Sequence, residues 1–534
     1  MKTKFVLFIF CLGFLTSTSA QQRKWYGTIE QTNSAKIVYC NDHIYMFGEK
    51  FGGNAKFNVT GSEVLYNLNG LFLAKYNTDG SVDWVKKIGD VTNLGDYKIK
   101  VSNQGDIYVY LNFTNDATIN SVKYTETGGY YENKLLMKLS EEGEIIWVKS
   151  IKSKDYMYRV QDMNIDRNGN VYLIGNYFSE IIFDENTALV SHEYYLNTPQ
   201  MEAYVAKYDK NGNVLWARAY PAKDDGFSDG YGIACDPNSD NILITGWFTG
   251  VFDYATNLQS EGERDMFFAK CDVNGNILWI KTAGGTNWDT GIAVAFDNQG
   301  NCIVAGCFDY FSGPVIIEGE ELNADIRYSN IFIAKYDSNG TFKWVRTGGG
   351  DAYFTDEPAE IVVDEYNDIY LGGYFGGIGS FGKFKVRVED SGSYTRMFLV
   401  KYNVDGQEIW AETGMATVFR SVNSIAMDKE NREIYVAGKY MSGPSGGYPF
   451  IQKYYDNSES SSTGIYDCEF STYNIYPNPT TDVIFLDAES HIKVYDLQGI
   501  LLQEIINNKV DLSAYPQGLY LLQVGNVWTK VMKK

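Results

Sequence analysis

The chain has 534 residues, which is too long for one ordinary core and indicates either several domains or one large repetitive domain. Its net charge of −21, from 46 Lys and Arg against 67 Asp and Glu, argues against nucleic acids and anionic membrane surfaces as partners, because both would be repelled. Aromatic residues make up 15% of the chain beside 52 glycines, a balance typical of an all-β protein with many short strands and tight turns.

The first 20 residues have the features of a secretory signal peptide. Met1-Lys-Thr-Lys4 supplies positive charge, residues 5–15 are apolar, and a run of small residues ends at Ala20. We expect cleavage after Ala20 and a soluble mature protein, because the apolar run is too short to span a bilayer as a mature helix and no longer uncharged apolar run follows.

A repeated phrase runs through most of the chain. An apolar strand that ends in Ala-Lys-Tyr-Asp, or in a close variant, is followed after a polar turn by a tryptophan. The tryptophans recur at intervals of 63 to 69 residues, which leaves room for four strands and their turns. They are Trp84, Trp147, Trp216, Trp279, Trp344 and Trp410.

Each unit is consistent with one antiparallel sheet of four strands. In the fifth unit the apolar runs 291–296, 301–308, 331–336 and 341–346 are separated by two polar turns and one longer loop. Such a sheet is the module of a propeller blade.

The turn Asp209-Lys-Asn-Gly212 and its equivalents are typical of tight hairpins, in which an Asx side chain caps the turn and the glycine adopts a positive φ. Calcium binding by Asp209, Asn211 and Asn213 is the alternative. An EF-type loop, however, requires glycine at its sixth position and glutamate at its twelfth, whereas here Gly212 is fourth and Tyr220 is twelfth. We therefore favour hairpins.

Counting the units predicts a seven-bladed β-propeller. Residues 421–427, 433–440 and 448–455 form a seventh set of inner strands, but no tryptophan strand follows them. Trp25 lies 59 residues before Trp84 and fits the phase of the repeat. We expect the N-terminal strand around Trp25 to complete the last blade, which removes two sheet edges that would otherwise invite aggregation.

The strand pattern resembles the bacterial β-propeller repeat family over residues 24–455. This resemblance implies a fold and carries no shared chemistry. We expect a propeller over residues 21–455.

A Ser-rich stretch over residues 456–470 is typical of a flexible linker. The segment beyond it, residues 471–534, has several short strands and turns, from which we expect a small β-sandwich. Its landmarks are Pro477, Asn478, Pro479, Gly499, Gly518 and Tyr520. In this order they resemble the type A C-terminal sorting domain of the type IX secretion system of Bacteroidetes. The resemblance implies that the export machinery of the outer membrane is a partner and that the protein is secreted or held at the cell surface.

The sequence offers little support for catalysis, a cofactor or a metal. His43, His192 and His491 have no recognisable nucleophile beside them. The six cysteines after the signal peptide, at positions 40, 235, 271, 302, 307 and 468, include no Cys-x-x-Cys pair, and we expect small buried hydrophobes rather than a zinc site, with disulfides left open. Adjacent carboxylates occur at Asp224-Asp225, Glu320-Glu321 and Asp356-Glu357, as the acidic composition alone would produce.

A ligand face is expected where the connections between blades, and the loops between second and third strands, emerge near the central channel. Aromatic residues beside carboxylates in these connections can stack on sugars or hold a peptide, although packing between adjacent blades is the favoured explanation for any single one of them. The candidates are Phe227, Asp229, Trp288, Asp289, Tyr353, Phe354 and Asp356.

Three functions remain open on this sequence. The first is a non-catalytic binding protein for an extracellular glycan or protein, with no cofactor. The second is a polysaccharide lyase or glycosidase that uses carboxylates of the loop face. The third is a structural surface spacer.

Overall fold

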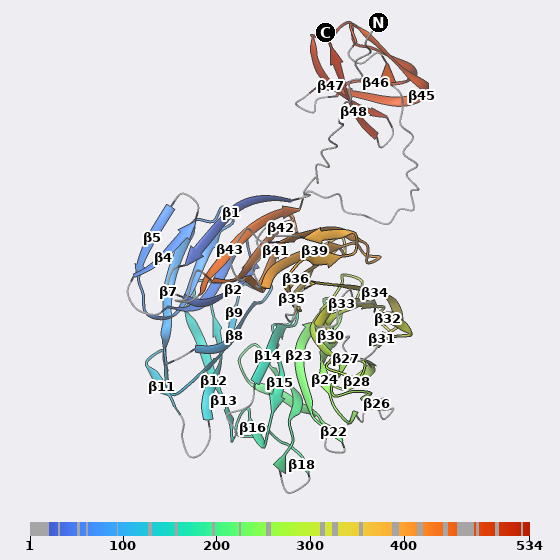
Figure 1. Cartoon of the computed structure of the whole chain (residues 1–534). Coiled ribbons are helices and arrows are strands. Elements are labelled where there is room, and N and C mark those ends of the chain that lie inside the picture. Colours follow the sequence, from blue (N-terminus) through green and yellow to red (C-terminus); the bar gives the residue numbers. More distant parts are fainter. Residues whose placement is uncertain are drawn as a thin grey trace, which may run out of the picture. The chain divides into compact units, whose positions relative to one another are not determined.

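The computed structural model divides the chain into two compact units, Met1–Ser461 and Ser462–Lys534 (Figure 1). It describes residues 21–534 except 30–31, 51–53, 60–61, 93, 126–130, 155–158, 195–197, 224–225, 253–257, 310–314, 323–328, 352–355, 387–394, 414–419, 442–446, 457–474, 477–479, 497–500 and 525–526. The expected signal peptide lies outside these residues. Among the described residues there is no α-helix, and therefore none long and apolar enough to cross a membrane.

The described part of the first unit contains seven antiparallel sets of four strands, each ordered from its inner to its outer strand. Sheet 1 is β2 (Thr32–Cys40), β3 (His43–Lys50), β6 (Gly70–Asn77) and β7 (Val82–Val91); sheet 2 is β8 (Leu94–Val101), β9 (Ile107–Phe113), β12 (Tyr131–Leu139) and β13 (Ile145–Ser153); sheet 3 is β14 (Arg159–Ile165), β15 (Val171–Tyr177), β20 (Glu202–Tyr208) and β21 (Val214–Tyr220). Sheet 4 is β23 (Ser228–Cys235), β24 (Ile242–Phe248), β27 (Asp265–Cys271) and β28 (Ile277–Ala283); sheet 5 is β29 (Thr290–Phe296), β30 (Cys302–Asp309), β33 (Ser329–Tyr336) and β34 (Phe342–Gly349). Sheet 6 is β35 (Glu357–Val363), β36 (Ile369–Gly376), β39 (Thr395–Tyr402) and β40 (Glu408–Thr413); sheet 7 is β41 (Arg420–Asp428), β42 (Glu433–Met441), β43 (Gly447–Asp456) and β1 (Gln21–Ile29).

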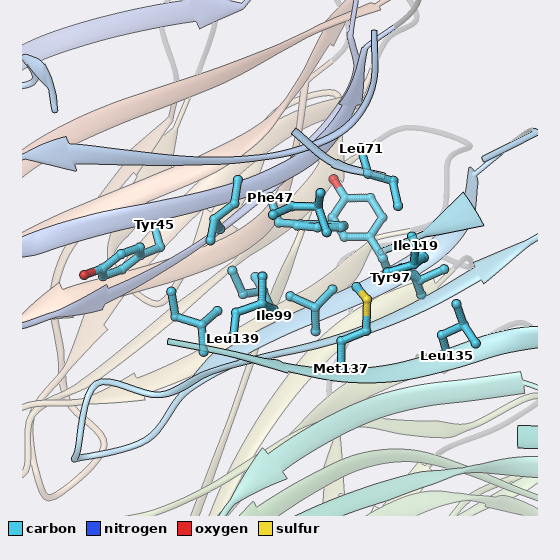
Figure 2. Close-up of a cluster of buried hydrophobic side chains, with 14 of the residues drawn as sticks. Tyr45, Phe47, Leu71, Tyr97, Ile99, Ile119, Leu135, Met137 and Leu139 are labelled. Atoms are coloured by element: carbon cyan, nitrogen blue, oxygen red, sulfur yellow. The ribbon is translucent and has the colours of Figure 1, made fainter. Parts of the chain in front are cut away.

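Consecutive sheets pack face to face around a common axis, which makes the first unit a β-propeller. The inner strands contact one another in the order β2, β8, β14, β23, β29, β35 and β41, and β41 contacts β2 again. Each buried apolar cluster lies between two consecutive sheets. Figure 2 shows the cluster between sheets 1 and 2, where Phe47 and Leu71 meet Tyr97, Leu135 and Met137.

The repeated tryptophan and the repeated glycine turn meet between neighbouring sheets. Trp344 at the outer strand of sheet 5 donates its indole N–H to the carbonyl of Val404, 3.1 Å away in the outer turn of sheet 6. Gly406 of the same turn has a φ of +77°, and a Cβ atom there would lie 2.5 Å from the Trp344 ring. Glycine is therefore required both by the backbone and by the indole that covers it. Equivalent pairs are Trp84 with Gly143, Trp147 with Gly212, Trp216 with Gly275 and Trp279 with Gly340.

The hairpin interpretation of these turns is confirmed at Asp209. Its carboxylate accepts hydrogen bonds from the backbone N–H groups of Asn211 and Asn213 and from the Asn213 side chain, at 2.8 to 2.9 Å. Gly212 has a φ of +81°. Both carboxylate oxygens of Asp209, which the calcium alternative requires, are thus engaged within the turn.

The repeated lysine is a buried tie between sheets. Lys335 Nζ lies 2.9 Å from the Asp297 carboxylate of its own sheet and 3.3 Å from the Val404 carbonyl of the next. Lys453 of sheet 7 contacts Glu433 of its own sheet and the Thr78 carbonyl of sheet 1, both at 2.7 Å. The same side chain therefore connects the last sheet to the first.

Most loops between second and third strands fold as hairpins that reach back to the outer strand of the preceding sheet. β4 pairs with β1, β10 with β7, β16 with β13 and β37 with β34, while β25 pairs with β22 just after β21, and Ile316 of β31 bridges Gly284 just after β28. This corrects the expectation that these loops lie near the channel; they cover part of the exposed outer edges instead. The hairpin strands are β4 (Asn54–Val59), β5 (Ser62–Asn67), β10 (Ala117–Ile119), β11 (Val122–Tyr124), β16 (Glu180–Ile182), β17 (Ala188–Val190), β25 (Val251–Phe252), β26 (Leu258–Gln259), β31 (Val315–Ile317), β32 (Glu320–Leu322), β37 (Gly379–Phe381) and β38 (Phe384–Val386), with β18 (Glu193–Tyr194), β19 (Thr198–Pro199) and β22 (Ala222–Lys223) beside them.

Sheet 7 is assembled from the two ends of the first unit. The backbone of β1 pairs antiparallel with β43, with Trp25 opposite Lys453, and Figure 1 shows these blue and orange strands side by side. Asp456, which the composition places at the start of the linker, is the last residue of β43 and is fully buried. Its carboxylate accepts hydrogen bonds from Tyr370, Lys401, Trp410 and Arg432. The indole of Trp410 therefore donates to a carboxylate of sheet 7, whereas Trp344 donates to a carbonyl in the turn of the next sheet.

The second unit is one curled five-stranded sheet, where the sequence predicts a sandwich. The long strand β45 (Val483–Tyr495) pairs with β44 (Ile475–Tyr476), β46 (Leu501–Asp511) and β47 (Gly518–Val524), and β48 (Val527–Lys533) completes the edge. A register shift between Phe485 and Ser490 lets β45 bend, so both halves of the sheet share it and enclose one core. Lys533 closes this core by donating to the Leu512 and Tyr515 carbonyls, each at 2.8 Å.

We predict that Gly406→Ala destabilises the protein more than Gly319→Ala. Both glycines have positive φ, of +77° and +87°, so both substitutions strain the backbone by about 1 to 2 kcal/mol. Only Gly406 faces an indole, whereas nothing lies within 4 Å of a Cβ at Gly319, and overpacking should add about 1 to 3 kcal/mol. Chemical denaturation of the full chain measures the difference, and equal losses would contradict the steric role of the turn.

Candidate functional site

The inner strands of the propeller enclose an axial cavity of about 640 Å³. All seven inner strands contribute to its lining. Lys36, Lys98, Asp162 and Glu360 occupy the equivalent register position of β2, β8, β14 and β35, opposite Phe47, Tyr110, Ile174 and Gly372 of the second strands. Charged side chains therefore project into the axis from four different sheets.

Ion pairs and side-chain-to-backbone bonds connect the walls of this cavity. Lys100 on β8 and Glu360 on β35 form an ion pair of 2.9 Å between two distant sheets. The other oxygen of Glu360 accepts from the Ile425 amide of β41 at 2.8 Å, and Asp162 accepts from the Ile233 amide of β23 at 3.1 Å. These carboxylates hold neighbouring inner strands in register as well as lining the cavity.

Tyrosines also line this cavity. Tyr374 donates its hydroxyl to Glu357 at 2.6 Å, and burial raises the pKa of Glu357. Tyr231 lines the cavity beside them. The cavity is thus lined by amino groups, carboxyl groups and aromatic rings.

Arg264, Trp247 and Trp288 form a stack at the end of sheet 4 where its inner strand begins, the same end at which Tyr231 and Glu357 lie. The Arg264 guanidinium lies between two indoles, 4.2 Å from the centroid of Trp247 and 4.5 Å from that of Trp288. Trp288 also donates its indole N–H to Glu263, yet 54% of its surface is exposed, whereas Trp247 is buried. A rigidly held indole with an open face is a suitable platform for a sugar ring or a peptide side chain.

The structure places the expected ligand-face residues in different environments. Phe227 and Trp288 are exposed. Asp289 and Asp356 are buried, and each carboxylate accepts hydrogen bonds from two loop amides, those of Gly285 and Asp309 and those of Gly350 and Gly376. Burial raises the pKa of each to about 7. Their carboxylates are directed at the loop backbone, and Tyr353 and Phe354 lie outside the described residues.

Asp229 differs from these two aspartates. It is also buried, but its Oδ1 atom has no hydrogen-bond partner among the described residues, and neither has Oδ1 of the neighbouring Asn176. Burial raises the pKa of Asp229 to about 7, against the lowering effect of Asn176, Arg159 and Gln161.

Sequence reasoning missed the cavity residues altogether. The available signal was a single charged residue interrupting an otherwise apolar inner strand, as in Ala35-Lys-Ile-Val38 and Ala359-Glu-Ile-Val362. Such interruptions recur at one register position and therefore converge on the axis.

The remaining candidates are not assembled into a catalytic arrangement in the described part of the chain. His192 contacts Glu202 at 2.7 Å, His491 contacts Glu504 at 2.8 Å, and His43 contacts the Asn41 carbonyl at 2.6 Å. Glu320 and Glu321 are exposed on β32, while Asp224 and Asp225 lie outside the description. The five described cysteines are free thiols, and no metal-ligating cluster occurs among the described residues.

In the second unit, the described landmarks of the sorting segment are structural. Tyr520 is buried and donates its hydroxyl to the Pro516 carbonyl at 2.5 Å, and Gly518 begins β47. Pro477, Asn478, Pro479 and Gly499 lie outside the described residues.

Comparison with known proteins assigns this second unit. Residues 474–534 match the family described as the secretion system C-terminal sorting domain. This is the sorting domain of the type IX secretion system, which confirms the resemblance seen in the sequence. The chain is therefore exported to the cell surface or the extracellular space, and the export machinery is its partner.

The propeller has more distant relatives. An uncharacterised WD repeat-containing protein of Acanthamoeba polyphaga mimivirus is 21% identical over 487 residues, which is 78% of this chain but 34% of the relative, so the chain spans about a third of the relative's length. Solved structures with similarity include a protein of unknown function from Dyadobacter fermentans (TM-score 0.36, 8% identity, 82% of this chain and 100% of that chain) and the β-propeller domain of the Trilobed protease from Pyrococcus furiosus (TM-score 0.40, 8% identity, 82% of this chain and 100% of that chain).

We predict that Asp229→Asn stabilises the protein above pH 7. Because the pKa of Asp229 is raised to about 7 from an ordinary value near 3.8, the folded state binds this proton more tightly than the unfolded state, and the contribution to stability grows as pH falls from 7 towards 4. At pH 8.5 the buried charge is a cost that Asn176, Arg159 and Gln161 offset only in part and that the amide removes, while the amide can donate to Asn176. We expect a melting temperature higher by about 2 to 4 °C at pH 8.5 and little difference at pH 4.

Glu320→Gln is the matched control for this measurement, since it removes an exposed carboxylate. Its melting temperature should follow the parent at both pH values. A constant effect of Asp229→Asn across this pH range would contradict the argument.

Proposed function

We propose that this chain is an exported, non-catalytic binding protein that holds an extracellular glycan or protein at the end of the propeller formed by sheets 4 to 6. The observation that carries the proposal is Trp288, a largely exposed indole that Arg264 and Glu263 fix in place. Rigid aromatic residues contribute much of the affinity of binding surfaces because little entropy is lost when they are covered. Phe227, on the loop that leads into sheet 4, is a second exposed aromatic residue at this end of the inner strands.

A propeller lyase or glycosidase is the second candidate, and it is favoured by the protonatable carboxyl groups Asp229 and Glu357 at this end of the inner strands. A general acid must carry a proton near neutral pH, which a raised pKa provides. A structural spacer is the third candidate and requires neither feature.

We predict that Trp288→Ala abolishes or weakens ligand binding by about tenfold or more. The experiment is a glycan and peptide array probed with the mature protein, followed by titration of each hit and analysis of the hit for cleavage. Tyr366→Ala is the matched control, because Tyr366 is also an exposed ring beside an arginine, Arg432, but lies in the turn at the other end of the inner strand of sheet 6. Cleavage of a hit would establish the enzyme instead, and silence of the parent on every array would leave the spacer.

We further propose that the propeller is a closed ring of seven blades in which Trp25 completes the last. Three observations support it: the apolar cluster between sheets 7 and 1, the contact of β41 with β2, and the register of β1 on β43. Trp25 stands opposite Lys453, with a one-residue bulge beside it, and each of the six repeat tryptophans stands opposite a repeat lysine with the same bulge.

We predict that Trp25→Ala lowers the stability of the mature protein by roughly 2 kcal/mol, because several of the equivalent tryptophans are only half-buried. Removing residues 21–30 should have a larger effect, since it unpairs β43 along its length. Thermal unfolding and limited proteolysis measure both changes. If both variants melt with the parent and resist protease equally, the ring is not closed by this strand.

A further inference from the structure

Lys36, like the exposed Lys429, lines the axial cavity without an ion pair to any of the described residues. Lys100 is paired with Glu360 at 2.9 Å, and Lys98 with Asp96 at 2.7 Å. Lys36 makes neither an ion pair nor a hydrogen bond through its amino group with any of the described side chains. The carboxylates of Asp96, Glu360 and Asp162 act on Lys36 only through space, so its half-buried ammonium group lacks the direct contact that a bound anion would supply.

The charged groups around Lys36 are of both signs, since Lys98, Lys100, Asp96, Asp162 and Glu360 line the same cavity. Lys98 is close enough for its charge to act on Lys36 directly. Lys98 pairs at 2.7 Å with Asp96, whose side chain is 47% exposed, so a bound anion would share the Lys98 ammonium group with Asp96. Asp162 is engaged by the backbone amides of Ile233 and Met163.

The same cavity also has aromatic rings that a small organic molecule could contact. Tyr231 and Tyr374 line the same cavity, and its volume of about 640 Å³ is in the range of small-molecule sites. An oxyanion group at Lys36 and Lys98 would leave the rest of a ligand against these rings.

We propose that the axial cavity binds a small organic anion whose carboxylate, or other oxyanion group, lies between the ammonium groups of Lys36 and Lys98. This proposal rests on the proposed binding function and names the chemical class of the ligand. An ammonium group paired with an oxyanion forms a charge-assisted hydrogen bond, which is among the stronger polar contacts in proteins.

The affinity should depend on pH in one direction. Burial, and then the charge of Lys98, lower the pKa of Lys36 to about 8, while Asp96, Glu360 and Asp162 raise it. Lys36 is therefore mostly protonated at pH 7 and mostly neutral at pH 9.5, so anion binding weakens as pH rises through this range.

The test is calorimetric titration of the mature full-length protein at low salt with D-glucuronate, with D-glucose and with inorganic sulfate. We expect glucuronate to bind at least about tenfold more tightly than glucose, which has the same ring without the charge. Lys36→Met should weaken glucuronate binding about tenfold or more, and Lys36→Arg should retain most of it, because the charge is kept. Lys87→Met is the control, since Lys87 is exposed on the outer strand of sheet 1 and pairs with Asp90.

Each result bears on the proposal. Sulfate binding that is lost in Lys36→Met supports it and identifies the oxyanion as the determinant, whereas glucuronate binding alone supports it with a contribution from the ring. Equal affinities for glucuronate and glucose, unchanged binding in Lys36→Met, or no binding of any probe would overturn it. Glucuronate binding that is lost in Trp288→Ala but unchanged in Lys36→Met would overturn this inference and leave the proposed function standing.

Discussion

A four-stranded sheet has two faces and can bury neither by itself, so every sheet of this propeller depends on its neighbours. The repeated phrase of the sequence is the solution to that constraint. Its apolar strands fill the space between sheets, its tryptophan covers the turn of the next sheet, its glycine leaves room for the indole, and its lysine reaches a carbonyl in the next sheet. Most of these parts act across a boundary between sheets, which is why they recur together.

Much of the fold follows from the sequence because this constraint is periodic. The strands of the fifth unit, its Asx-glycine turns and the role of a tryptophan strand can all be predicted from residues alone. The hairpins that reach back to preceding sheets cannot, since most of their strands have only two or three residues and are too short to show alternation. The curled second unit also differs from prediction, because a shared strand with an internal register shift has no distinctive pattern.

The cavity was hidden for a different physical reason. Several inner strands contain a register shift, between Val160 and Asp162 and between Pro358 and Glu360 for example. Such a shift moves every following side chain to the other face, so simple alternation does not indicate which residues face the axis. The lysines and acids of the channel therefore looked like ordinary polar strand residues. In a chain with a net charge of −21, a cavity lined by as many lysines as carboxylates is a local departure that only the fold brings together.

The seventh sheet joins residues 21–29 to residues 447–456, and so places the two ends of the propeller in one hydrogen-bonded ladder. During synthesis and passage across a membrane, β1 emerges first and must wait for almost the whole propeller before its partner strand exists. The loop that this pairing closes is the longest in the domain, and its entropic cost falls on the last step of folding. The sorting domain, residues 474–534, follows β43 in the chain, so this export signal is complete only after every strand of sheet 7 has been made.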